Sequence, residues 1–197
     1  IFRDSLATHS NVCNGCFKTI YTLATNRALE LGIPLIVTGL SRGQLFETRL
    51  IPQQFALDRF DPDAIDRAVQ NARRSYHRID DAANRLLDTS AFKSDHVFET
   101  IEYLDFYRYI DVDLSTMLAY LAERTPWLRP EDTGRSTNCL INAAGIYSHI
   151  KEQGYHNYAV PYAWDVRLGH KTRIEAIEEL DDDLDLEDVS RMLGQIG

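Results

Sequence analysis

The sequence predicts an α/β fold in which helices cover a parallel β-sheet. Three observations support this prediction. Residues 13–31 carry apolar residues at helical spacing. The continuous apolar run that follows, residues 33–40, is typical of a strand buried on both faces of a parallel sheet. Further along, a strand-forming stretch at 101–110 precedes an amphipathic helical stretch at 113–124, so helix and strand alternate.

The first helix has clear boundaries. Ser10 or Asn11 is the expected N-cap, and Gly32 followed by Pro34 ends the helix. Its expected buried face consists of the apolar residues at helical spacing, which are Phe17, Ile20, Tyr21, Ala24, Ala28 and Leu31. The strand after it ends in TGLSRGQ, residues 38–44. Ligands of parallel α/β sheets bind at the carboxyl ends of the strands, so we expect a binding site there.

The TGLSRGQ segment supplies candidate ligand-binding residues. Gly39 and Gly43 would let the backbone approach a ligand closely. Ser41, Arg42 and Gln44 can form hydrogen bonds with it.

The next part of the chain predicts a helical insertion, residues 61–95. Asp61 and Pro62 are the expected N-cap and first residue of a long charged helix that runs to about Leu87. In the following α/β element, Asp113 is the expected cap of the helix at 113–124.

The carboxyl-terminal part predicts a loop followed by helices. Residues 125–136 contain two prolines and one glycine and predict an ordered loop. Cys139 is placed in the first turn of a helix that ends near Gly154. A short helix near 186–193 closes the chain.

Composition limits the classes of function. The 197 residues are 44% hydrophobic and 26% charged, which suits one domain over residues 1–197. The net charge of −9 disfavours a surface that binds nucleic acid and favours a small-molecule or carrier-bound substrate. Neither a signal peptide nor an apolar run long enough for a membrane span is visible, and the cysteines are odd in number, so we expect a cytoplasmic protein with no membrane partner.

The three cysteines are the strongest candidates for chemistry. Cys13 and Cys16 are three residues apart at a helix start, so their thiols lie on one face. Cys139 is also expected at a helix start, where thiolates are favoured. Three alternatives stay open: a metal or iron–sulfur site that uses all three cysteines, a dithiol redox pair, or inert buried thiols.

A small basic group in this acidic chain is a second candidate. Arg167, His170, Lys171 and Arg173 could hold a phosphate or a carboxylate. The alternative is a solvated surface cluster with no ligand.

These motifs resemble part of a known superfamily. Over about residues 10–55 and 100–178, the chain resembles the second half of the PP-loop ATP pyrophosphatases, also called adenine nucleotide alpha hydrolases. Their iron–sulfur tRNA thiolation enzymes, such as tRNA 2-thiocytidine synthetase, end a strand in G-H-N-x-x-D-x-x-E-T. This chain matches at Gly39, Glu47 and Thr48 and has Leu40 and Gln44 in place of the His and Asp. The sequences DTGRSTNCLIN and WDVRLGHKTRIEA are similar to N-acetyl sugar amidotransferases of the same superfamily.

The resemblance implies a partial Rossmann-like sheet (HUP type) and an ATP-dependent sulfurtransferase. ATP, with magnesium, would adenylate the substrate, and a 4Fe-4S cluster on Cys13, Cys16 and Cys139 would deliver sulfur. One alternative is an ATP-dependent amidotransferase or ligase with a structural zinc on the same cysteines. Another is a non-catalytic, metal-stapled interaction domain.

The superfamily's S-G-G-x-D-S pyrophosphate loop is not found in the sequence. The resemblance therefore implies that this chain is the carboxyl-terminal part of the ATPase domain, with the loop supplied upstream in the same chain or by another chain. The negative charge disfavours tRNA as a substrate unless a partner domain supplies a basic surface. A homodimer stays open.

Overall fold

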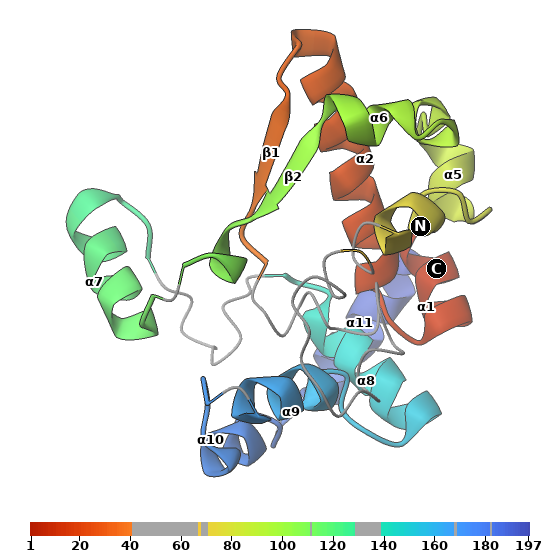
Figure 1. Cartoon of the computed structure of the whole chain (residues 1–197). Helices are drawn as coiled ribbons and strands as arrows, with labels where there is room; N and C mark the ends of the chain where they lie inside the picture. The colour runs from red at the N-terminus through yellow and green to blue at the C-terminus, as the bar shows by residue number, and fades with distance from the viewer. Residues whose placement is uncertain (41–66, 68–70, 111, 129–138, 168, 182) are drawn as a thin grey trace.

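The computed structural model describes residues 1–40, 67, 71–110, 112–128, 139–167, 169–181 and 183–197 (Figure 1). The elements in chain order are α1 (Phe2–His9), α2 (Cys13–Leu31), β1 (Leu35–Thr38), α5 (Ala82–Leu86), η2 (Ser90–Lys93), α6 (His96–Thr100), β2 (Glu102–Asp105), η3 (Phe106–Arg108), α7 (Leu114–Arg124), α8 (Asn142–Gln153), α9 (Ala159–Arg167), α10 (Arg173–Glu178) and α11 (Leu186–Ile196). Residues 71–76 are also helical. The described structure is thus mostly helical.

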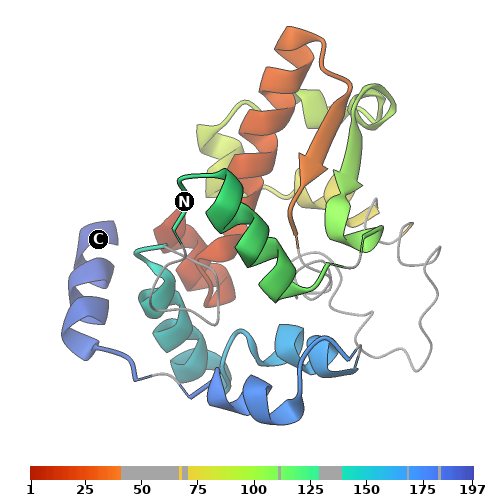
Figure 2. The same cartoon turned by 90° about the vertical axis from the view of Figure 1, so that its left-hand side faces the viewer.

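Helix α2 and strand β1 form the unit on which the rest is arranged. The helix spans the predicted residues and ends at Gly32, whose φ of 64° lies in the left-handed region that glycine adopts without strain. The chain then turns back, and β1 runs along α2 in the opposite direction (Figures 1 and 2). The first turn of α2 and the carboxyl end of β1 therefore lie toward the same end of the unit.

The two strands are parallel, as predicted. They pair in register from Leu35 opposite Glu102 to Thr38 opposite Asp105. Strand β1 is shorter than the expected 33–40, because it is flanked by a proline, which cannot donate to the ladder, and by a glycine. The coarse prediction of helices packed on a parallel sheet is supported.

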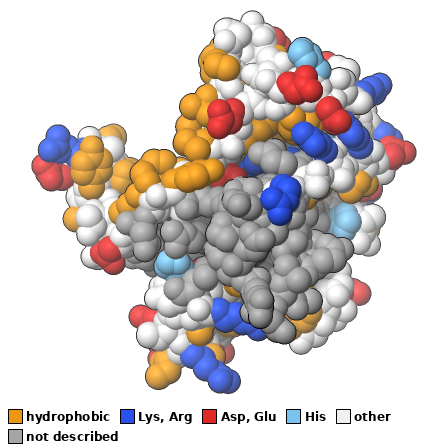
Figure 3. All heavy atoms as spheres, in the orientation of Figure 1, with side chains coloured by type: hydrophobic (Ala, Val, Ile, Leu, Met, Phe, Trp, Pro, Cys, Tyr) orange, Lys and Arg blue, Asp and Glu red, His pale blue; other side chains and the backbone are white. Residues whose placement is uncertain are grey.

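The core lies between α2 and one face of the strand pair. Its buried members are Tyr21, Ala28, Ile101 and Tyr103. The opposite face is open in the described residues, because Leu35 and Val37 are 42% and 56% exposed. The prediction that β1 is buried on both faces is therefore wrong for the described part of the chain. Figure 3 shows hydrophobic side chains gathered along this side of the molecule.

The buried face of α2 also differs from the predicted one. Ile20 and Leu31 are more than half exposed. Tyr21 and Ala28 are buried as predicted, and the other side chains that turn inward are Lys18, Thr22 and Thr25. Two of these polar residues are accommodated by hydrogen bonds: Lys18 bonds Asp81 at 2.8 Å, and Thr25 and Tyr103 share a hydrogen bond of 2.5 Å between their hydroxyls.

The long helix predicted up to Leu87 is interrupted. Residues 71–76 are helical, residues 77–81 are not, and α5 then begins after Asp81. The Asp81 carboxylate caps this new helix by accepting from the backbone N–H of Asn84 at 3.0 Å. Most of the predicted helix before residue 71 lies outside the described residues.

The carboxyl-terminal half is helical. Asp113 caps α7 as predicted, by accepting from the backbone N–H of Thr116 at 3.0 Å. This helix projects from the body, and α8 to α11 lie toward the end at which α2 begins (Figures 1 and 2). Helix α11 packs on α8, and Arg3 of α1 donates to the carbonyl of Ile196 at 3.3 Å. Among the helices that the structure describes, none has the length and apolarity of a membrane span.

Candidate functional site

The first turn of α2 holds two of the three cysteines. Cys13 is the first residue of the helix and Cys16 lies one turn further, and both are half-buried. The Asn11 side chain accepts from the backbone N–H of Cys13 at 2.7 Å. Ser5 accepts from the N–H of Gly15 at 3.2 Å and donates to the carbonyl of Asn11 at 2.5 Å. The residues before the helix therefore fix the backbone that carries the two thiols.

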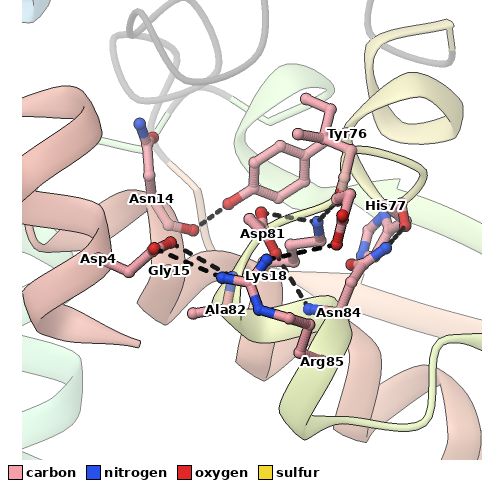
Figure 4. Close-up of polar contacts among 12 residues, drawn as sticks. Asp4, Asn14, Gly15, Lys18, Tyr76, His77, Asp81, Ala82, Asn84 and Arg85 are labelled. Carbon is pink, nitrogen blue, oxygen red and sulfur yellow. Dashed lines mark hydrogen bonds and ion pairs between the residues drawn. The ribbon is translucent and has the colours of Figure 1, made fainter.

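A second set of contacts ties this turn to the segment 76–81 (Figure 4). Lys18 is fully buried, and its ammonium group donates to the carbonyl of Ile79 and to the Asp81 carboxylate, both at 2.8 Å. The Tyr76 hydroxyl donates to the backbone carbonyl of Asn14. Asn14 lies two residues before Cys16 and Lys18 lies two residues after it. The helix turn that carries Cys16 is therefore anchored on both sides.

The carboxyl ends of the two strands carry a buried polar cluster. Arg73 donates to both Asp105 oxygens, at 2.7 and 2.8 Å, and Thr38 donates to one of them at 2.6 Å. Arg73 is 2% exposed and Asp105 is 5% exposed. The guanidinium lies over the rings of Tyr21 and Tyr103, 5.7 and 5.1 Å from their centroids. This cluster joins the last residues of both strands.

The protonation states in this region follow from burial and from the neighbouring charges. Burial is the largest single influence and alone would lower the pKa of Arg73, but the interactions with Asp105 and Tyr21 together outweigh it, and the pKa is raised. Burial lowers the pKa of His77 to about 4, and the hydrogen bond from its Nδ1 to the carbonyl of Arg73 offsets part of that effect. The His77 ring stacks on Phe92 with a centroid separation of 3.9 Å. Arg73 is therefore charged and His77 neutral at pH 7.

The predicted ligand-binding segment begins at this edge. Gly39 directly follows β1, and a Cβ built there would meet no atom of the described part of the chain within 4 Å. Packing within the described residues therefore does not require a glycine at this position. Ser41, Arg42, Gly43 and Gln44 lie outside the described residues.

Cys139 is placed differently from the prediction. It precedes α8 by three positions, and its carbonyl accepts from the backbone N–H of Asn142 in a turn at 3.1 Å. The helix begins only at Asn142 and ends, as expected, before Gly154. Cys139 is exposed, whereas the other two cysteines are half-buried.

All three cysteines lie within the described residues, so their arrangement can be compared with that of a metal centre. No three side chains of the Cys, His, Asp or Glu type are grouped there in a way that could hold a metal ion. Cys13, Cys16 and Cys139 thus do not form a ligand set in this arrangement. The residues as placed do not fit a three-cysteine cluster or zinc site.

The predicted basic group is engaged in local contacts. Lys171 forms an ion pair with Glu179 and lies 4.8 Å from the centroid of the Tyr162 ring. Arg167 lies over the Trp164 ring at 5.4 Å. His170 and Arg173 are both exposed. An ion pair already compensates one of the four cations of the group.

A cleft lies elsewhere on the molecule, between α1, α8 and α11. Its lining includes Arg3, Ser10, Ser148 and Glu152, with Leu6, Ala7, Leu193 and Ile196 as the apolar part. Among the predicted ligand-binding residues that the structure describes, none lines this cleft.

Sequence inspection missed the buried charges Lys18, Arg73 and Asp105. One signal was available for Lys18: it shares the helical spacing of Tyr21 and Thr25, so a lysine stands on the stripe that faces inward. Arg73 and Asp105 are 32 residues apart, and no local pattern links them.

Comparison of the chain with models of protein families, with curated proteins and with solved structures finds no match. The resemblance to the PP-loop superfamily therefore rests on the sequence motifs.

Proposed function

We propose that this chain contributes the substrate-activating part of an ATP-dependent adenylating enzyme of the PP-loop type, with sulfur transfer as the reaction that follows adenylation. ATP with magnesium would adenylate a substrate oxygen and release pyrophosphate, and a sulfur nucleophile would then displace AMP. The resemblance of residues 38–48 to the family motif is the sequence argument for this proposal.

One structural observation carries the proposal: Thr38 and Gly39, the described start of the TGLSRGQ segment, lie at the end of the α2–β1 unit toward which the cysteine-bearing turn also lies (Figures 1 and 2). From Cys13 to Leu31 the helix extends about 27 Å, whereas β1 extends only about 10 Å. The cysteine turn therefore reaches beyond the strand end, on the side where α/β proteins bind their ligands. This is the arrangement that a nucleotide site beside a sulfur-bearing group requires.

The buried cluster at the strand ends would position this site. Arg73 and Thr38 hold the Asp105 carboxylate, so the last residues of β1 and β2 stay aligned at the point where Gly39 begins the candidate loop. Both charges are buried, which gives them a positioning role and leaves substrate contact to the loop. A glycine-rich phosphate-binding loop would come from a further segment, in the same chain or in another, because the sequence contains none.

The proposal does not include the iron–sulfur cluster that the resemblance implies, because the three cysteines as placed do not form a set of three ligands. The site that holds the sulfur before transfer is predicted only by the resemblance to the superfamily. Sulfur transfer is preferred over ammonia transfer because two thiols stand at the relevant end of the unit.

The test is pyrophosphate release from ATP by the full-length protein with Gly39→Val. Because a Cβ at Gly39 meets no atom of the described residues within 4 Å, the substitution should not disturb their packing and should act on a bound nucleotide. Gly194→Ala is the matched control, at another glycine with open space around it. The proposal predicts loss of ATP-dependent pyrophosphate release in Gly39→Val alone. Equal release by both variants would contradict it, as would the absence of pyrophosphate release when the unsubstituted protein is assayed together with the segment that carries the phosphate-binding loop.

A further inference from the structure

We propose that Cys13 and Cys16 form a two-thiol site that undergoes dithiol–disulfide exchange with small disulfides, and that Cys139 takes no part in it. This inference goes beyond the proposed function and does not depend on it. It starts from the disagreement between the three-cysteine site that the resemblance implies and the described structure, which does not group Cys139 with the other two cysteines.

The helix geometry brings the two cysteines within reach of a disulfide. Residues three apart on an α-helix have their Cα atoms about 5 Å apart, from a radius of about 2.3 Å and a rise of about 1.5 Å per residue. Disulfides need a Cα separation of about 4.4 to 6.8 Å. Cys13 and Cys16 are both within regular helix and lie on the same face of its first turn. No movement of α2 relative to its neighbours is needed to join them.

The turn is also held in place before the bond forms. Asn11 and Ser5 bind the backbone N–H groups of Cys13 and Gly15. The buried Lys18 and the Tyr76 hydroxyl tie the following residues to segment 76–81 (Figure 4). A disulfide here closes a loop within one helical turn, so oxidation should leave the packing of α2 unchanged.

The glycine between the two cysteines, Gly15, has a structural explanation. A Cβ at Gly15 would lie 2.4 Å from the Ile1 side chain and 3.5 Å from Ser5, so the close approach of α1 favours glycine. Cys13 and Cys16 are both half-buried, so a part of each residue is accessible to solvent. A pair of partly accessible thiols on one helix turn is the arrangement that dithiol chemistry requires.

The exchange balances with a small disulfide RSSR as the oxidant. The Cys13 thiolate attacks one sulfur of RSSR, the reagent S–S bond breaks, and RS⁻ leaves and takes a proton. The Cys16 thiolate then attacks the Cys13 sulfur of the mixed disulfide and expels the second RS⁻. Two protein thiols lose two electrons, and RSSR becomes two RSH. Cys13 attacks first because it is the first residue of the helix, where the backbone dipole favours a thiolate most.

The experiment equilibrates the full chain in buffers of reduced and oxidised glutathione, quenches it with acid, and labels the remaining thiols with N-ethylmaleimide for mass analysis. Oxidation should remove two of the three labels, those of Cys13 and Cys16, and leave Cys139 labelled. Cys139→Ser should keep the same midpoint. Cys16→Ser should accumulate a mixed disulfide on Cys13, whereas the matched variant Cys13→Ser should accumulate much less on Cys16.

Three results would overturn the inference. The first is a disulfide that includes Cys139, and the second is full labelling of Cys13 and Cys16 at every glutathione ratio. The third is stoichiometric iron or zinc in the anaerobically purified chain that is lost in Cys139→Ser, since this would restore the three-cysteine metal site.

Discussion

The Arg73–Asp105 pair offers the most quantitative test of the structure at the carboxyl end of the sheet. Asp105→Ala removes both hydrogen bonds to the guanidinium and the one from Thr38, and it leaves a guanidinium that is 2% exposed without a counter-charge. Breaking a buried pair in this way costs about 3 to 5 kcal/mol of unfolding free energy. A domain of this kind has about 5 to 15 kcal/mol in total, so the variant should remain folded but with a much lower urea midpoint.

The assay is urea unfolding followed by circular dichroism, arranged as a double-mutant cycle with Arg73→Met. The double variant buries no charge, so it should be more stable than Asp105→Ala alone. Asp95→Ala serves as the control, because Asp95 forms a solvent-exposed pair with Arg78, and its loss should have far less effect. A loss below about 1 kcal/mol in Asp105→Ala, or no coupling with Arg73→Met, would refute the buried-pair argument.

Three further predictions concern the rest of the core. Burial lowers the pKa of His77 from 6.5 to about 4, so on acidification the unfolded chain takes up the proton before the folded chain does. The contribution of neutral His77 to the unfolding free energy should be fully present above pH 6.5 and should fall by about 3 kcal/mol as the pH drops toward 4. In urea titrations at each pH, His77→Phe should flatten this slope. Lys18→Met should lower the melting temperature and speed amide exchange in the first turns of α2, whereas Arg27→Met, at a side chain that is 67% exposed, should change neither. Val37→Lys, on the open face of β1, should leave the unfolding free energy almost unchanged, whereas Ile36→Lys, packed against the core, should abolish folding as seen by circular dichroism; the reverse order would show that the faces of the strand are wrongly assigned.

Elements with a local signal could be predicted from the sequence. The α2 boundaries follow from apolar spacing and from Gly32, and the start of α7 follows from the capping carboxylate of Asp113. The parallel pairing of β1 with β2 followed from the alternation of helix and strand. The two helix boundaries depend on residues that are close in sequence, whereas the strand pairing joins segments 67 residues apart and was expected only from the general pattern of alternating helices and strands.

Features that depend on distant partners could not be predicted. The inward face of α2 is set by Lys18 and Thr25, whose partners Asp81 and Tyr103 are 63 and 78 residues away. A polar residue is expected to be exposed unless its hydrogen-bond partner is known. The sequence therefore predicts a buried face of α2 that includes Ile20, which is exposed in the structure. The same limit applies to the three-cysteine site: spacing places two thiols on one turn but gives no information on where a third thiol, 123 residues further on, lies, and the described residues do not group the three.

The central claim is that the first turn of α2 holds a two-cysteine site that works without Cys139. The most direct measurement is the ¹³Cβ chemical shift of each cysteine in the full chain, followed by NMR through a glutathione redox titration. If Cys13 and Cys16 form the site, their signals should move together to oxidised values with one midpoint, while the Cys139 signal stays at its reduced position. Movement of the Cys139 signal with either of the others, or reduced values for all three cysteines throughout the titration, would contradict the claim.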